Sequence, residues 1–121
     1  MVNNPRDLQS LLDLDGVVIE LLEGRYFVRF EAHAVPAIDE VPHGIKYSLT
    51  LHSRAGTRLV GFDNAHRVVV RRGRFADRPA ASDHWHIGAR DRGKPYRFES
   101  AGKLLEDFWK EVERITGIEE S

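Results

Sequence analysis

The segment IKYSLTLHSRAGTRLVGF, residues 45–62, alternates apolar and polar side chains on both sides of a short polar turn. Successive side chains of a strand point to opposite faces, so this alternation is typical of a strand with one buried face. Arg54-Ala55-Gly56 predicts a short hairpin loop, and residues 57–62 predict the return strand. The residues expected to face the core are Ile45, Tyr47, Leu49 and Leu51, and those expected to face away are Lys46, Ser48, Thr50 and His52.

Two more predicted strands precede this hairpin. Residues 17–22, VVIELL, are rich in β-branched side chains, and Glu23-Gly24 can turn the chain. Residues 25–35, RYFVRFEAHAV, alternate as the next strand, and residues 36–44 predict a loop because they hold two prolines. The strand 25–35 is expected to turn Tyr26, Val28, Phe30, Ala32 and Ala34 to one face, and Phe27, Arg29, Glu31 and His33 to the other.

Both ends of the chain change to a helical period. Leucines recur at near-helical spacing after Pro5, which predicts a short N-terminal helix ended by Asp15-Gly16. Residues 101–116 predict a longer helix between the N-cap Ser100 and Gly117. Its apolar positions are Leu104, Leu105, Phe108, Trp109, Val112 and Ile115. The chain therefore predicts an α+β fold, a single antiparallel sheet with N- and C-terminal helices packed on one face.

The part of the chain between the hairpin and the last helix is less regular. Residues 66–73, HRVVVRRG, predict a short strand, and residues 74–83, RFADRPAASD, predict a mobile polar loop. Residues 84–87, HWHI, predict a strand, and residues 95–100, PYRFES, predict another strand or strand end. Period 2 places His84 and His86 away from the core, with Trp85 and Ile87 towards it.

Length and composition fit one domain over residues 1–121. The absence of cysteine excludes disulfides and thiolate chemistry, and no apolar run is long enough for a membrane helix, so a cytoplasmic location is expected. Charge is uneven: the segment from Arg54 to Arg97 holds 11 of the 18 Lys and Arg residues and 4 of the 19 Asp and Glu residues, a local net charge of +7. Such a segment suits a polyanion, although arginines also collect in solvated loops.

Polar residues gather around two of the predicted strands. Asp63 and His66 follow the strand 57–62, and His84 and His86 project to one side of the strand 84–87. Histidine titrates near neutral pH, so these residues suit an acid–base centre in which Asp63 orients a histidine. Two imidazoles with a third ligand could also hold a metal, and ordinary polar turn and surface residues would show the same pattern. We predict the catalytic set Asp63, His66, His84 and His86, expected to converge if the two strands are neighbours.

Arginines next to this set predict the binding of phosphate. Arg67, Arg71 and Arg72 offer planar guanidinium groups that bind phosphate through paired hydrogen bonds. With Asn64, they are the predicted RNA-binding residues. The chain holds no glycine-rich phosphate loop, serine nucleophile elbow or paired-carboxylate motif.

Three stretches together resemble one known family. They are YSLTLHSRAGTRLVGFDNAH (residues 47–66), DHWHI (residues 83–87) and YRFESAGKLLEDFWKEVERI (residues 96–115). The order D-N-A-H, D-H-x-H and L-x-D-F-W is similar to that of the TumE-like toxins of toxin–antitoxin modules. The resemblance covers roughly residues 45 to 116. It implies a toxin that is held inactive by a cognate antitoxin and that attacks RNA or translation.

Three mechanisms are consistent with these residues. The first is a toxin of a type II system that cleaves RNA without metal or other cofactor, using the histidines for proton transfer and the arginines for phosphate. The second is a non-catalytic toxin that blocks RNA or a protein by occupancy. The third is a metal-dependent nuclease. No membrane partner is expected, and the sequence leaves a homodimer open.

Overall fold

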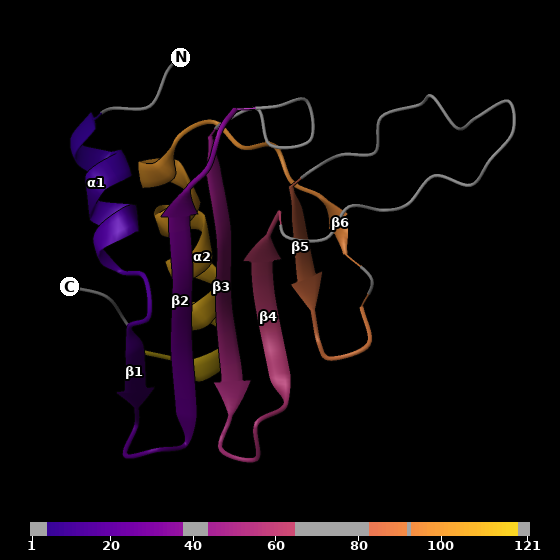
Figure 1. The fold of residues 1–121 in the computed structure, drawn as a ribbon. Coiled ribbons are helices and arrows are strands. Elements are labelled where there is room, and N and C mark those ends of the chain that lie inside the picture. The colour runs from indigo at the N-terminus through magenta and orange to yellow at the C-terminus, as the bar shows by residue number, and fades with distance from the viewer. Residues whose placement is uncertain (1–4, 38–43, 65–82, 92, 119–121) are drawn as a thin grey trace, which may run out of the picture.

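The computed structural model describes residues 5–37, 44–64, 83–91 and 93–118. It contains one six-stranded antiparallel sheet with the strands in sequence order, and two helices on one of its faces (Figure 1). The elements are α1 (Pro5–Asp13), β1 (Val18–Leu21), β2 (Tyr26–Ala34), β3 (Ile45–Ser53), β4 (Arg58–Asp63), β5 (His84–Ile87), β6 (Lys94–Pro95) and α2 (Ala101–Thr116). The predicted α+β class is confirmed.

The centre of the sheet is the long β2–β3 pair, whose register runs from Tyr26 opposite Ser53 to Ala34 opposite Ile45. Its inner face follows the predicted alternation. Every second residue is buried, because the period of two turns the apolar set towards the helices. The buried residues of the pair are Val28, Phe30, Ala32, Ile45, Tyr47, Leu49 and Leu51.

Helix α2 closes this core from behind the strands in Figure 1. The Ser100 side chain accepts a hydrogen bond from Lys103 N at 3.1 Å, and Gly117 ends the helix at φ 77°. Phe108 is fully buried, and its ring meets Phe30 and Phe62 edge-on at centroid distances of 5.8 and 6.1 Å. The predicted helix is confirmed at both ends.

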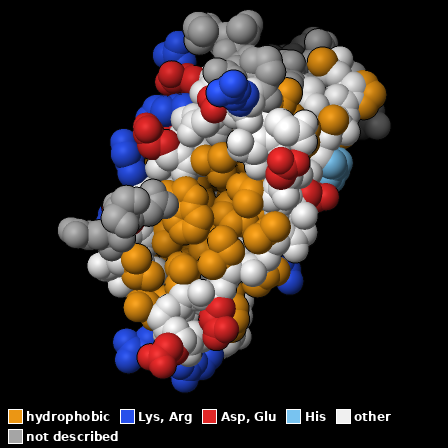
Figure 2. Space-filling view, turned by 90° about the vertical axis from the view of Figure 1, so that its left-hand side faces the viewer, with side chains coloured by type: hydrophobic (Ala, Val, Ile, Leu, Met, Phe, Trp, Pro, Cys, Tyr) orange, Lys and Arg blue, Asp and Glu red, His pale blue; other side chains and the backbone are white. Residues whose placement is uncertain are grey.

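Helix α1 covers β2 and contacts α2. Its Leu11 is fully buried, and the turn after it is tied to the sheet, because Asp15 Oδ1 accepts from Ala32 N at 3.0 Å. Hydrophobic side chains gather on the side of the molecule shown in Figure 2. Half-buried hydrophobic residues of α1 and β1 include Leu8, Leu12, Ile19 and Leu21. No helix in the described ranges is long and apolar enough to cross a membrane.

Three details differ from the sequence predictions. Ile87 was expected in the core but is 40% exposed at the end of β5, where the short strand β6 pairs only with His84 and Trp85. Ala34 is exposed at the end of β2. Of residues 95–100, expected to be a strand or a strand end, only Pro95 belongs to a strand, β6, although Tyr96 N still donates to Asp83 O at 2.9 Å. The strand predicted at 66–73 and most of the loop predicted at 74–83 lie outside the described residues.

Candidate functional site

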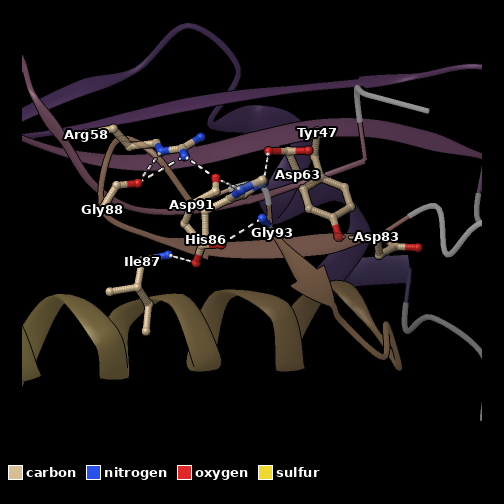
Figure 3. Close-up of polar contacts among 9 residues, drawn as sticks. All are labelled: Tyr47, Arg58, Asp63, Asp83, His86, Ile87, Gly88, Asp91 and Gly93. Carbon is tan, nitrogen blue, oxygen red and sulfur yellow. Dashed lines mark hydrogen bonds and ion pairs between the residues drawn. The ribbon is translucent and has the colours of Figure 1, made fainter. Parts of the chain in front are cut away.

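We call the face of the sheet opposite the two helices the open face. It carries a close contact between a carboxylate and an imidazole. Asp63 ends β4, His86 lies on β5, and His86 Nε2 stands 3.1 Å from Asp63 Oδ2 (Figure 3). Each side chain is only 8% exposed. The register places Gly61, not Asp63, directly opposite His86. Glycine has no side chain to occupy that place, so the imidazole can reach diagonally to Asp63.

The other ring nitrogen of His86 is held by a backbone carbonyl. His86 Nδ1 lies 2.9 Å from Asp91 O. A carbonyl oxygen can only accept, so Nδ1 carries the hydrogen in this arrangement. A neutral His86 therefore turns its Nε2 lone pair towards the carboxylate. That arrangement is repulsive unless a proton lies between the two groups, so the contact is attractive only when Nε2 or the carboxyl group carries a proton.

The contact between Asp63 and His86 is close but poorly aligned. Within the described part of the chain, Asp63 Oδ1 and His86 Nε2 are the buried side-chain polar atoms that lack a well-formed hydrogen bond. The 3.1 Å approach of Nε2 to Oδ2 satisfies the distance of an ion pair without the angle of a hydrogen bond. Buried polar atoms are usually satisfied, and an exception calls for a physical explanation, of which a catalytic role is one. The Asp63–His86 pair is therefore the best candidate for a reactive centre on the open face.

The loop after β5 fixes the ring of His86. The Asp91 carboxylate accepts from Ile87 N at 2.8 Å and from Gly93 N at 2.9 Å, and these two hydrogen bonds lower the pKa of Asp91. Arg58 from β4 donates to Gly88 O and to Asp91 O, both at 3.0 Å through Nη2. The carbonyl that orients His86 is thus itself held from a second strand, as Figure 3 shows.

His84 joins the pair on the same face. It lies directly opposite Asp63 in the β4–β5 register and is 7% exposed. The ring centroids of His84 and His86 are 6.4 Å apart. The adjacency of the strands 57–62 and 84–87 that the sequence analysis required is therefore present, and Asp63, His84 and His86 come together. His66 and the arginines Arg67, Arg71 and Arg72 lie outside the described residues.

Asn64 is also buried, but its amide faces the neighbouring strand. Its Oδ1 accepts from Tyr47 N at 2.9 Å, and its Nδ2 donates to Ile45 O at 2.7 Å. Both hydrogen bonds continue the β3–β4 pairing one residue past the end of β4. The side chain thereby fixes the backbone that carries Asp63.

Asp83, the aspartate of the D-H-x-H motif, has a different partner from that of Asp63. Tyr47 Oη donates to Asp83 Oδ2 at 2.6 Å, and Tyr47 belongs to the buried inner face of β3. Burial, followed by the charge of Asp83, raises the pKa of Tyr47, so its hydroxyl stays protonated and remains a donor. This contact secures the start of β5 against β3.

Sequence reasoning missed the residues that hold His86. Arg58 begins β4, Asp91 and Gly93 follow the turn after β5, and their hydrogen bonds involve backbone atoms. The tripeptide Asp91-Arg92-Gly93 contains a usable signal, since Asp and Gly two positions apart are common in tight turns. No group of three metal-binding side chains is present among the residues that the structure describes.

The fold and site define a small α+β protein whose open sheet face carries a buried carboxylate–imidazole pair. The sequence matches the model of the family described as Toxin TumE over residues 10–116, so the chain belongs to the TumE toxin family. This confirms the family suggested by the D-N-A-H, D-H-x-H and L-x-D-F-W motifs. Membership of a toxin family points to an antitoxin as partner. Comparison with curated proteins and with solved structures gives no match.

Proposed function

We propose that this protein is the toxin of a type II toxin–antitoxin pair and cleaves RNA in the cytoplasm without a metal ion. The observation that carries the proposal is the Asp63–His86 pair, buried and 3.1 Å apart, with the second ring nitrogen of His86 fixed by Asp91 O. An imidazole held in one tautomer beside a carboxylate is a common arrangement for proton transfer.

The proposed chemistry uses both histidines of β5. One imidazole takes the proton of a ribose 2′-hydroxyl, which attacks the adjacent phosphorus, and the other gives a proton to the departing 5′-oxygen. Their centroid separation of 6.4 Å allows them to flank one phosphodiester. Asp63 stabilises the charged form of His86. His66 remains a candidate for the same proton transfers. In this scheme Arg67, Arg71 and Arg72 bind neighbouring phosphates, and Asn64 acts by fixing the strand end that carries Asp63.

One observation favours a second candidate function. The side chains of Asp63 and His86 are each only 8% exposed, which also suits a structural ion pair. In that case the protein acts by occupancy, binding RNA or a protein without cleaving it. The antitoxin would then block a binding surface and would not protect a catalytic centre.

The deciding experiment combines growth arrest with an RNA cleavage assay. The toxin is induced without antitoxin as wild type, Asp63→Asn, His84→Gln and His86→Gln, with His33→Gln as a matched control because His33 is exposed on β2. Circular dichroism verifies that each variant is folded. The catalytic proposal expects arrest and cleavage to be lost in the first three variants and kept in the control.

The chemical ends of the RNA products and the effect of a chelator on cleavage distinguish the mechanisms. Cleavage by the 2′-hydroxyl leaves 2′,3′-cyclic phosphate ends and continues in EDTA. Loss of cleavage in EDTA, restored by a divalent metal, indicates a metal-dependent nuclease. Folded His84→Gln, His86→Gln and Asp63→Asn variants that still arrest growth would replace the catalytic proposal with occupancy.

A further inference from the structure

A hollow lies on the open face of the sheet, away from the Asp63–His86 pair. It has a volume of about 380 Å³ and lies where the ends of β2 and β3 meet the turn after β3. Its lining includes Phe27, Arg29, His52, Ser53 and Arg54. None of these residues belongs to the histidine signatures, and none has a role in the chemistry proposed above. We name this site the Phe27 hollow.

The formally charged side chains that line the Phe27 hollow are all positive. Arg29 and Arg54 contribute guanidinium groups, and no carboxylate of the described residues lines the space. Arg29 is exposed and makes no ion pair within the described ranges. Arg54 is held in place, because its Nε donates to Gly24 O at 3.2 Å. An unpaired arginine beside an anchored one forms a site for an anion that can accept several hydrogen bonds, such as a phosphate.

The imidazole of His52 is also oriented in advance. Its Nδ1 lies 3.3 Å from Gly56 O, and its Nε2 lies 2.8 Å from Thr50 Oγ1. Phe27 stands directly opposite His52 in the β2–β3 register. The hollow therefore combines cationic donors with a half-buried aromatic ring. Aromatic rings stack on nucleic-acid bases and guanidinium groups bind the backbone, which is the usual composition of a single-strand binding site.

The sheet register connects this hollow to the candidate active site. Arg29 lies opposite Thr50, Thr50 opposite Gly61, and Gly61 opposite His86. Neighbouring strands are about 4.8 Å apart, so Arg29 and His86 lie roughly 14 Å apart across the sheet. The Arg58 side chain passes over Gly61, since a Cβ on that glycine would lie 3.3 Å from Arg58 Cδ. Arg29 and Arg58 thus form a cationic path that ends at His86.

We propose that the Phe27 hollow is a nucleotide-binding subsite, and that single-stranded RNA follows the cationic path from it to the Asp63–His86 pair. Arg29 and Arg54 bind phosphate, and a base stacks on Phe27. Glu31, next to Arg29 on the outer face of β2, repels phosphate and directs the strand towards β4. This inference rests on the proposed function, because it names the substrate path of the same site.

The test measures binding separately from cleavage. The probe is a short, fluorescently labelled single-stranded oligoribonucleotide with 2′-O-methyl groups, which the proposed chemistry cannot cut. Its affinity for the purified chain is measured over a range of salt concentrations. The variants are Arg29→Ala/Arg54→Ala and Phe27→Leu. The matched control is Arg6→Ala/Arg114→Ala, which removes the same charge from α1 and α2 on the opposite face. Thermal unfolding verifies the fold of each variant.

The expected results differ between variants. Loss of two phosphate contacts should reduce the slope of log affinity against log salt by about 1.4 in Arg29→Ala/Arg54→Ala. Phe27→Leu keeps the apolar contact but removes the stacking face, so binding should weaken about five-fold or more with an unchanged salt slope. The control should bind with the wild-type slope.

Four results would overturn the inference. The first is that the wild type does not bind RNA, and the second is that Arg29→Ala/Arg54→Ala keeps the wild-type affinity and salt slope. The third is that a nucleoside monophosphate binds as tightly as the oligonucleotide. The fourth is that the protein prefers an acidic peptide to RNA. The growth-arrest test keeps the two proposals apart. If the Asp63 and His86 variants still arrest growth while Arg29→Ala/Arg54→Ala loses RNA binding, the catalytic proposal fails and the subsite proposal stands. The reverse pattern rejects the subsite alone.

Discussion

Gly93 lies so close to the imidazole of His86 that a Cβ on Gly93 would stand 2.5 Å from His86 Cε1 and 2.9 Å from its Nδ1. Gly93 also adopts φ 104°, a conformation that side chains rarely accept. The glycine therefore lets the loop after β5 close onto the ring, which brings the Asp91 carbonyl to Nδ1. The orientation of His86 therefore depends on glycine at position 93 and on the positive φ of that glycine.

Gly93→Ala should therefore destabilise the protein. Backbone strain and overpacking each contribute about 1–3 kcal/mol, so the free energy of unfolding should fall by more than about 2 kcal/mol in urea denaturation. Gly88→Ala is the matched control, because Gly88 has φ 88° but nothing within 4 Å of an added Cβ. In Gly88→Ala, the free energy of unfolding should fall only by the amount that the backbone strain costs. Equal losses for the two variants would show that the contact with His86 is unimportant.

Asp91→Asn should change how stability depends on pH. Hydrogen bonds from Ile87 N and then Gly93 N lower the pKa of Asp91 from its ordinary value of 3.8. A carboxyl whose pKa is lower in the folded state stabilises the fold above its unfolded pKa, and this contribution disappears as pH falls through the folded pKa. The difference in urea midpoint between wild type and Asp91→Asn should be constant above about pH 5 and shrink below the ordinary value. A difference that stays constant into acid would contradict the role of the charge.

The fold was largely predictable, because its signals are local. The alternation in residues 45–53 and the helical period in residues 101–116 each describe one element with one buried side. Ile87 was assigned wrongly since alternation gives the face of a residue but not how completely that face is covered at the end of a strand. The closeness of Asp63, His84 and His86 followed from period 2 once β4 and β5 were neighbours. The roles of Arg58 and Asp91 were not predictable, because they depend on backbone carbonyls that only the closed loop brings together.

Phe108→Ala tests the packing of α2 on the sheet. Phe108 is fully buried and contacts the rings of Phe30 and Phe62, so its removal leaves a cavity in the core. The free energy of unfolding should fall by about 3–5 kcal/mol, measured by urea denaturation. Lys110→Ala, on the exposed side of the same helix, should change it by less than about 0.5 kcal/mol. A loss below about 1 kcal/mol for Phe108→Ala would contradict this packing.

Arg67, Arg71 and Arg72 remain a prediction from the sequence, motivated by the local net charge of +7. RNA affinity of the wild type should fall steeply with salt. If each arginine binds one phosphate of a single strand, Arg67→Ala/Arg71→Ala/Arg72→Ala should reduce the slope of log affinity against log salt by about 2. The measurement is a fluorescence anisotropy titration at several salt concentrations. Equal slopes for wild type and variant would exclude these residues as phosphate contacts.

The protonation of His86 Nε2 beside Asp63 can be measured directly by nitrogen-15 NMR of the imidazoles. Because Asp91 O accepts from His86 Nδ1 at 2.9 Å, Nδ1 should carry hydrogen in the wild type and in Asp63→Asn. An asparagine amide can donate to an unprotonated Nε2, whereas the Asp63 carboxylate favours a proton on Nε2. The Nε2 resonance should therefore move towards the unprotonated position in Asp63→Asn and lie nearer the protonated position in the wild type.

His52 provides the internal control for this measurement. It lies on the same sheet face, but its ring contacts Gly56 O and Thr50 Oγ1 and has no contact with Asp63. Its resonances should be unchanged by Asp63→Asn. A His86 ring with hydrogen on Nε2 and none on Nδ1 would show that Asp91 does not fix the tautomer, and Nε2 would then donate to the Asp63 carboxylate from a neutral ring. If Nδ1 keeps its hydrogen and only Nε2 responds, Nε2 is the nitrogen that exchanges protons, which is the property that proton transfer to RNA requires.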